Sequence, residues 1–215
     1  MSKSRFPYQY IAIEGNIGAG KTTLAKMLQA DLNSDLILEQ FSDNPFLSNF
    51  YDNPERHAFS VELFFMAERH KQFQEHFSKP SLFSSPFVIS DYIFEKTVLF
   101  AKNNLKGEEF RLFQRLFAVL KSNFTEPDIL IYLYRDVPHL MDNIKQRGRE
   151  YEKQISPEYL SNIQQAYLSY FKTVTTYPIV VMDIEDLDFT QDALFMKKIK
   201  SRLETKYKPG LHFVN

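Results

Sequence analysis

The stretch YIAIEGNIGAGKTTL, residues 10–24, decides the fold of this chain. It opens with an apolar run, continues with a glycine-rich turn, and ends with a lysine and two threonines that begin a helical pattern. This order predicts a buried strand, a loop that binds phosphate, and a helix.

The loop satisfies the pattern G-x-x-x-x-G-K-[ST]. In this pattern backbone N–H groups surround phosphate oxygens, and the start of the helix adds the positive end of its dipole. Glycine is needed because a side chain would block both the tight turns and the close approach of the phosphates. We expect a nucleotide site, with ATP as donor, formed by Gly15, Asn16, Ile17, Gly18, Ala19, Gly20, Lys21, Thr22 and Thr23.

Composition narrows the class of protein. The 215 residues suit one compact α/β domain spanning residues 1–215. The absence of cysteine excludes disulfides, cysteine zinc sites and a thiol nucleophile. The net charge of −1 gives no general attraction for nucleic acid or an anionic membrane. With no apolar run of about 18 residues and no signal-peptide pattern, we expect a cytoplasmic protein.

Further apolar runs alternate with helical patterns along the chain. Strands are expected at 8–14, 36–38, 86–89, 129–134 and 178–182. Helices are expected at 21–29, from 44–45 onward, and at 57–77, 94–103, 108–123, 138–147, 157–177 and 191–206. This alternation predicts a parallel sheet covered by helices on both faces. All strands then end at the edge where the phosphate loop lies.

Charged residues follow several of these strands. Glu39, Asp91 and the pair Arg135-Asp136 all stand at strand ends, so we expect them to converge on the nucleotide. Glu39 is a candidate base for an acceptor hydroxyl, although a solvated turn residue is the alternative. Asp91 is a candidate, with Thr22, for the shell of a Mg²⁺ ion; its alternative is a helix cap.

Two other features suit phosphoryl transfer. Arg147 and Arg149 flank Gly148 in a charged segment at about 145–155, and they could close over the phosphates as a lid. The alternative is a cationic helix end stopped by glycine. Glu62 and Arg69 are seven residues apart and share one face of a helix, together with aromatic neighbours.

These motifs, taken in order, resemble the deoxynucleoside kinase family, whose members phosphorylate the 5′-hydroxyl of deoxyribonucleosides. The resemblance runs from about Tyr10 to Asp183. It rests on EGNIGAGKTT at 14–23, Glu39, Y-x-x-P-x-R-x-x-F-x-x-E at 51–62, Phe100-Ala101, and RGR at 147–149. It implies a P-loop fold with five parallel strands in the order 2-3-1-4-5, and a homodimer.

The resemblance also implies roles. Glu39 would be the general base, with Lys21, Asp91, Arg147 and Arg149 completing the catalytic set. Tyr51 and Glu152 would hold the 3′-hydroxyl of the sugar. Glu62 falls where the family has a base-reading glutamine, Arg69 lines the same pocket, and Phe100 stacks on the base. Residues 183–189 would receive the adenine of the donor.

Two positions depart from the family pattern. The acid-Arg-Ser motif after the third strand is replaced by Ser90-Asp91-Tyr92. Either Tyr92 stands in the arginine position, which we prefer, or the register shifts by one; Arg147 and Arg149 must then meet more of the charge. The second departure is Glu62, because a carboxylate only accepts hydrogen bonds whereas glutamine also donates them.

A carboxylate matches the paired N1–H and N2–H₂ donors of guanine, and this favours deoxyguanosine. Bacterial relatives that resemble the chain include deoxyadenosine kinases, so the expectation is a purine. The nearest alternative is a nucleoside monophosphate kinase such as thymidylate kinase. A nucleotide-dependent switch or ATPase is a further alternative, although the N-K-x-D guanine motif is absent.

Overall fold

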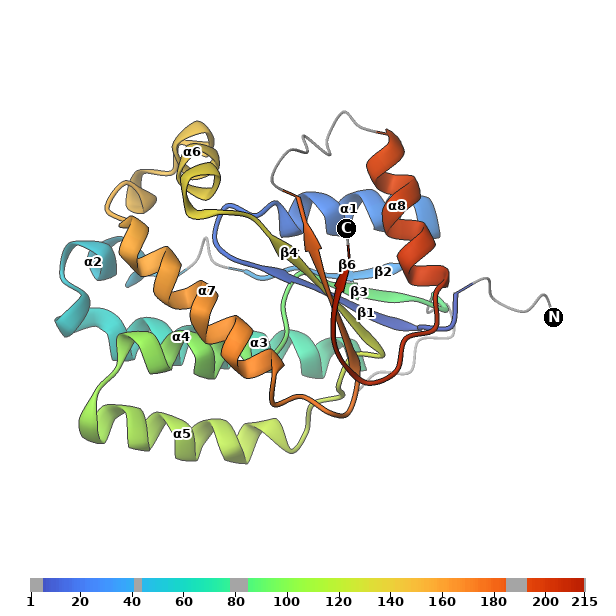
Figure 1. The fold of residues 1–215 in the computed structure, drawn as a ribbon. Coiled ribbons are helices and arrows are strands. Elements are labelled where there is room, and N and C mark those ends of the chain that lie inside the picture. The colour runs from blue at the N-terminus through green and yellow to red at the C-terminus, as the bar shows by residue number, and fades with distance from the viewer. Residues whose placement is uncertain (1–5, 41–43, 78–84, 185–192, 215) are drawn as a thin grey trace.

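The computed structural model describes residues 6–40, 44–77, 85–184 and 193–214, and Figure 1 shows their arrangement. The strands are β1 (Tyr10–Gly15), β2 (Asp35–Ile37), β3 (Val88–Ser90), β4 (Ile129–Tyr134), β5 (Pro178–Asp183) and β6 (Gly210–Val214). The α-helices are α1 (Lys21–Leu32), α2 (Leu47–Asp52), α3 (Pro54–Phe77), α4 (Lys96–Asn104), α5 (Gly107–Lys121), α6 (Val137–Arg147), α7 (Pro157–Phe171) and α8 (Ala193–Glu204). A 3₁₀ helix, η1, covers Glu150–Glu152.

The strands form one parallel sheet in the order β2-β3-β1-β4-β5-β6. The predicted order 2-3-1-4-5 is confirmed. The predicted number of strands was too small, because β6 adds a sixth strand beside β5. Its Phe213 side chain is 71% exposed, so the strand lacks the fully buried apolar run that revealed the others.

Side chains of the central strands alternate between two cores. Ile11 and Ile13 of β1 pack into one core with α1, α6 and α8, whereas Ala12 between them faces α7 and α4. Figure 1 shows these two helical layers on opposite sides of the sheet. Both faces are therefore buried, which explains why the strands read as uninterrupted apolar segments.

A third core lies among the helices beyond the C-terminal ends of the strands. It joins α2, α3, α4 and α5 through buried residues such as Phe50, Met66 and Phe113. This helical group forms a wall opposite the phosphate loop. The third core thereby encloses the space into which the strand ends point.

Two helix boundaries differ from the predicted ones. Helix α3 begins at Pro54 rather than 57, and the Asn53 side chain accepts from Arg56 N at 3.3 Å. Helix α7 ends at Phe171 rather than 177 because a run of β-branched residues follows, and β-branched side chains lose rotamer freedom in a helix. No helix in the described part of the chain is long and apolar enough to span a bilayer.

Candidate functional site

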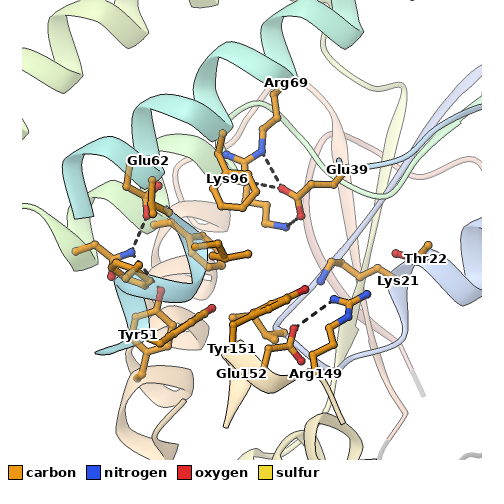
Figure 2. Close-up of a pocket in the computed structure, with 18 of the residues that line it drawn as sticks. Lys21, Thr22, Glu39, Tyr51, Glu62, Arg69, Lys96, Arg149, Tyr151 and Glu152 are labelled. Carbon is orange, nitrogen blue, oxygen red and sulfur yellow. Dashed lines mark hydrogen bonds and ion pairs between the residues drawn. The ribbon is translucent and has the colours of Figure 1, made fainter. Parts of the chain in front are cut away.

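A cavity that is partly open to solvent lies at the carboxyl edge of the sheet. Figure 2 shows side chains from the phosphate loop, α3, α4 and the segment after α6 pointing into it. The predicted site residues that line it are Ile17, Lys21, Thr22, Glu39, Tyr51, Glu62, Arg69, Asp91, Phe100, Arg147, Arg149 and Glu152.

The other predicted loop residues do not line this cavity. Asn16 is 2% exposed and its amide donates to the Leu160 carbonyl at 2.8 Å, so its side chain faces α7. Gly15, Gly18, Ala19, Gly20 and Thr23 are likewise outside the cavity lining. Gly15 is needed for packing against the sheet, because an added Cβ would lie 2.8 Å from the Leu133 carbonyl.

Gly18 and Lys21 give the loop its shape and charge. Gly18 has φ +84°, and an added Cβ would lie 2.9 Å from the carbonyl of Leu140 on α6. The ammonium of Lys21 donates to the carbonyl of Asn16 at 3.0 Å and so lies across its own loop. Burial, with the nearby charge of Lys96, lowers the pKa of Lys21 to about 8.

Glu39 is held between two cations. Its Oε1 accepts from Arg69 Nε at 2.9 Å and Nη2 at 2.5 Å, and its Oε2 accepts from Lys96 Nζ at 2.5 Å (Figure 2). Burial alone would raise the pKa of Glu39, but the charges of Lys96 and Arg69 outweigh it and hold the pKa well below its usual range. Glu39 is therefore not a freely solvated turn residue.

Asp91 connects the phosphate loop to the Glu39 segment. One carboxylate oxygen accepts from the Thr22 hydroxyl, and the other accepts from the backbone N–H of Glu39 at 2.7 Å. Helix α4 begins later, at Lys96, so Asp91 does not cap it. The hydroxyl and carboxylate together form an oxygen pair of the kind that Mg²⁺ prefers when phosphates complete its shell.

Glu62 lies deep in the cavity with a neutral partner. It is 2% exposed, and its Oε1 accepts from Asn104 Nδ2 at 2.6 Å. Asn104 also donates to the Tyr159 hydroxyl at 3.2 Å. Burial raises the pKa of Glu62 to about 7, although the Asn104 hydrogen bond and the Arg69 charge oppose the shift. Although they share a helix face, Glu62 and Arg69 have different hydrogen-bond partners.

The segment predicted as a lid has features of both interpretations, a helix end stopped by glycine and arginines that face the nucleotide site. Gly148 ends α6 in a left-handed conformation, as a helix stop does. Arg147 Nη2 donates to both oxygens of Glu152, each at 2.7 Å, and Arg149 Nη1 donates to Oε1 at 3.3 Å. Glu152 is 5% exposed. The two arginines face the cavity while sharing a buried carboxylate.

Three residues near the strand ends lie outside the cavity: Tyr92, Arg135 and Asp136. The Tyr92 hydroxyl lies 2.9 Å from the side-chain amide of Gln72, in the protein interior, so Tyr92 does not bring a polar group to the cavity. Arg135 and Asp136 do not line the cavity either: Arg135 donates to the Ile184 carbonyl at 2.7 Å, and Asp136 caps α6. Residues 185–189 of the predicted donor-base loop lie outside the described residues.

Several cavity residues were missed by the sequence analysis. They are Leu47, Phe50, Val61, Phe65, Lys96, Asn104, Tyr151 and Tyr159. Lys96 and Asn104 are the first and last residues of α4. The fully buried Glu14, also missed as a structural residue, accepts from Ile93 N at 3.0 Å and Tyr167 Oη at 2.9 Å. A charged residue inside an apolar strand was the signal that could have revealed it.

Comparison with known proteins decides the family. The family model described as deoxynucleoside kinase matches residues 11–207. The chain belongs to the deoxynucleoside kinase family. It is an enzyme that transfers phosphate to a deoxynucleoside, and the monophosphate-kinase and switch alternatives are not favoured.

Relatives of this deoxynucleoside kinase are named for different nucleoside substrates. A deoxyguanosine kinase of Bacillus subtilis (strain 168) is 35% identical over 182 residues, covering 83% of this chain and 81% of the relative. A deoxyadenosine/deoxycytidine kinase of the same organism is 32% identical over 200 residues, covering 90% of each. The structure of deoxyadenosine kinase from M. mycoides with bound dCTP has a TM-score of 0.76 and 26% identity, covering 90% of this chain and 100% of that one.

Proposed function

We propose that this deoxynucleoside kinase prefers a purine deoxyribonucleoside and uses ATP with Mg²⁺. The observation that carries the purine preference is the buried carboxylate of Glu62, which meets Asn104 at the end of the cavity remote from Lys21. The Asn104 amide donates to Glu62 Oε1 and to the Tyr159 hydroxyl, so the acceptor that remains for the edge of a base is Glu62 Oε2. The names of the relatives, deoxyguanosine and deoxyadenosine kinases, agree with this preference.

In the proposed reaction the 5′-hydroxyl lies beside Glu39. The hydroxyl oxygen forms a bond to the γ-phosphorus as the bond to the leaving ADP oxygen breaks, and the hydroxyl proton passes to the Glu39 carboxylate. Lys21 and the loop amides hold the phosphates in line with that oxygen. Tyr51 and Glu152 bind the sugar, and Phe100 packs against the base.

Thr22 and Asp91 would hold the Mg²⁺ ion. When bound, the ion offsets the negative charge that builds up between the β- and γ-phosphates. Asp91 also keeps the backbone of Glu39 in place through its other oxygen. The carboxylate thus links the metal position to the proposed base.

An acceptor panel tests the purine preference. Eight nucleosides, ribo and deoxy, are compared with ATP and Mg²⁺, and deoxyguanosine and deoxyadenosine are also compared with their monophosphates. We expect the highest kcat/KM with a purine deoxynucleoside and negligible turnover of monophosphates. A pyrimidine preference would refute the proposal.

We also propose that the enzyme is a homodimer. Helix α5 presents Leu112, Leu116 and Val119 to solvent with 47%, 37% and 70% exposure, and their spacing places them on one face. A second copy of this chain would cover them. Light scattering should give twice the chain mass, and Val119→Glu should shift it toward the monomer. A monomeric wild-type protein would contradict this.

A further inference from the structure

Lys96 brings a buried cation to the reaction centre from a position that no motif marks. It is the first residue of α4 and is 5% exposed. Its Nζ lies 2.5 Å from Glu39 Oε2 and 5.5 Å from the centre of the Phe100 ring. The ammonium therefore lies between Glu39, the proposed general base, and Phe100, which we propose stacks on the nucleobase.

The two cations that hold Glu39 differ in how firmly they are fixed. Arg69 donates twice to Glu39 Oε1, and its Nη1 donates to the Thr97 hydroxyl at 2.8 Å. Lys96 approaches the other oxygen through one ammonium at the end of a flexible chain. A rigid guanidinium fork with a second anchor is suited to keep its place, whereas an ammonium exchanges partners readily.

Lys96 also acts electrostatically on the phosphate loop. Its charge contributes, after burial, to the lowered pKa of Lys21. Two ammonium groups thus share the end of the cavity where the γ-phosphate would lie, with Glu39 and Asp91 close by. A bound triphosphate would relieve their mutual repulsion, because each ammonium could face phosphate oxygens instead.

The contacts of Glu39 with Arg69 and Lys96 make it poorly suited to accept a proton. A carboxylate held by two cations keeps its negative charge and is a weak proton acceptor. At the same time the chain lacks the arginine that usually follows the third strand, and Tyr92 in that position faces the interior. Glu39 would accept a proton more readily with one cation fewer, and the phosphates need a cation in place of the missing arginine. Both requirements are met if one cation moves from Glu39 to the phosphates.

We propose that Lys96 is that cation, exchanging its contact with Glu39 for the γ-phosphoryl group when the donor binds and so serving in place of the missing arginine. The inference rests on the proposed reaction at Glu39. Lys96 donates hydrogen bonds throughout and transfers no proton. The proton of the 5′-hydroxyl still passes to Glu39, and the only heavy-atom bonds that change are the two at phosphorus.

Two variants and a control test the role of Lys96. Lys96→Met removes the charge and keeps the chain length, Lys96→Arg restores a cation, and Lys102→Met removes an exposed lysine from the same helix. We expect Lys96→Met to lower kcat with the best purine deoxynucleoside by about 100-fold or more, with KM for that nucleoside changed by only a few-fold. Lys96→Arg should recover at least part of kcat, and Lys102→Met should match the wild type.

Two further readouts separate contact with phosphate from a structural role. If Lys96 binds the γ-phosphoryl group, Lys96→Met should weaken binding of a non-hydrolysable ATP analogue at least 10-fold while leaving ADP binding nearly unchanged. The acidic limb of the kcat–pH profile should stay near its wild-type position, because kcat reports the donor complex, in which Lys96 has already left Glu39. Equal loss of both nucleotides, or a normal kcat, would overturn the proposal.

The outcome can be told apart from failure of the purine assignment. Nucleotide binding is measured without an acceptor, so it reports on Lys96 whichever nucleoside the enzyme prefers. If Lys96→Met fails to fold by thermal melting, the same measurements on Lys96→Gln and Lys96→Arg decide. If Lys96→Gln and Lys96→Arg bind the ATP analogue with the same affinity, the charge at this position does not matter and the inference is refuted.

Discussion

Asn104 Nδ2 donates to Glu62 Oε1 at 2.6 Å, and this contact leaves Glu62 Oε2 without a hydrogen-bond partner among the described residues. A buried oxygen in this state is costly unless a ligand supplies a donor. The pair therefore offers an unused acceptor inside the cavity. N1–H or N2–H₂ of guanine, or N6–H₂ of adenine, could satisfy it.

Glu62→Gln should change base selectivity. Replacing the carboxylate by an amide exchanges one acceptor for a donor, and mismatched polar groups in a buried site are discriminated strongly. We expect the ratio of kcat/KM for deoxyguanosine to that for deoxyadenosine to fall by about 10-fold or more. Glu75→Gln, an exposed change on the same helix, serves as control. An unchanged ratio would remove Glu62 from base recognition.

The same ratio should depend on pH. The pKa of Glu62 is raised to about 7, so the group is mostly protonated at pH 6 and mostly ionised at pH 8. The protonated form donates and accepts, which suits adenine, whereas the ionised form suits guanine. The groups that face it are Arg69, Lys96, Glu39, Tyr51 and Tyr159. We expect relative deoxyguanosine activity to rise across this interval, and to become flat in Glu62→Gln.

Glu39→Gln should greatly lower kcat while the protein stays folded. The amide keeps the shape of the side chain but cannot accept the hydroxyl proton, so we expect kcat to fall by about 10²–10⁴-fold. ATP binding, measured by calorimetry, should stay within a few-fold of the wild type. Glu39→Ala should additionally lower the melting temperature, because it leaves two buried cations unpaired. Near-normal kcat in the glutamine variant would exclude Glu39 as the base.

Gly18→Ala and Gly107→Ala form a matched pair. Both glycines have positive φ, but a Cβ at Gly18 would lie 2.9 Å from the Leu140 carbonyl, whereas nothing lies within 4 Å at Gly107. We expect Gly107→Ala to cost about 1 kcal/mol of unfolding free energy, and Gly18→Ala to cost more. Gly18→Ala should also weaken ATP binding. Urea unfolding and calorimetry check the two effects; equal costs would show that the contact with α6 is easily relaxed.

The sequence predicted the parts of this protein that follow from strong local rules. The phosphate loop was evident from its glycine spacing, and the central strands from apolar runs that both sheet faces require. The convergence of Glu39 and Asp91 followed from the geometry of parallel strands. Strand β6 was missed because Leu211 and Phe213 alternate with other residues at a half-exposed sheet edge.

Contacts between residues that are far apart in the sequence were harder to predict. Lys96 reads as an ordinary solvated lysine at a helix start, and only the packing of α4 against the cavity places it beside Glu39. Asn104 is eight residues further along and meets Glu62 through the contact of α4 with α3. Tyr92, which we prefer to place in the position of the family arginine, lies in the interior with its hydroxyl beside Gln72. Such pairings depend on tertiary packing, which local patterns do not encode.

The Asn143 side chain on α6 donates to the Gly18 carbonyl at 2.9 Å. This bond fastens the helix that carries Arg147 to the phosphate loop itself. Any swing over a bound nucleotide must therefore pivot after the helix, at Gly148, and move Arg149 while Arg147 stays with α6, because tilting α6 would distort the loop that binds the donor. Arg149 is the one residue between that pivot and η1, so the closing movement is short.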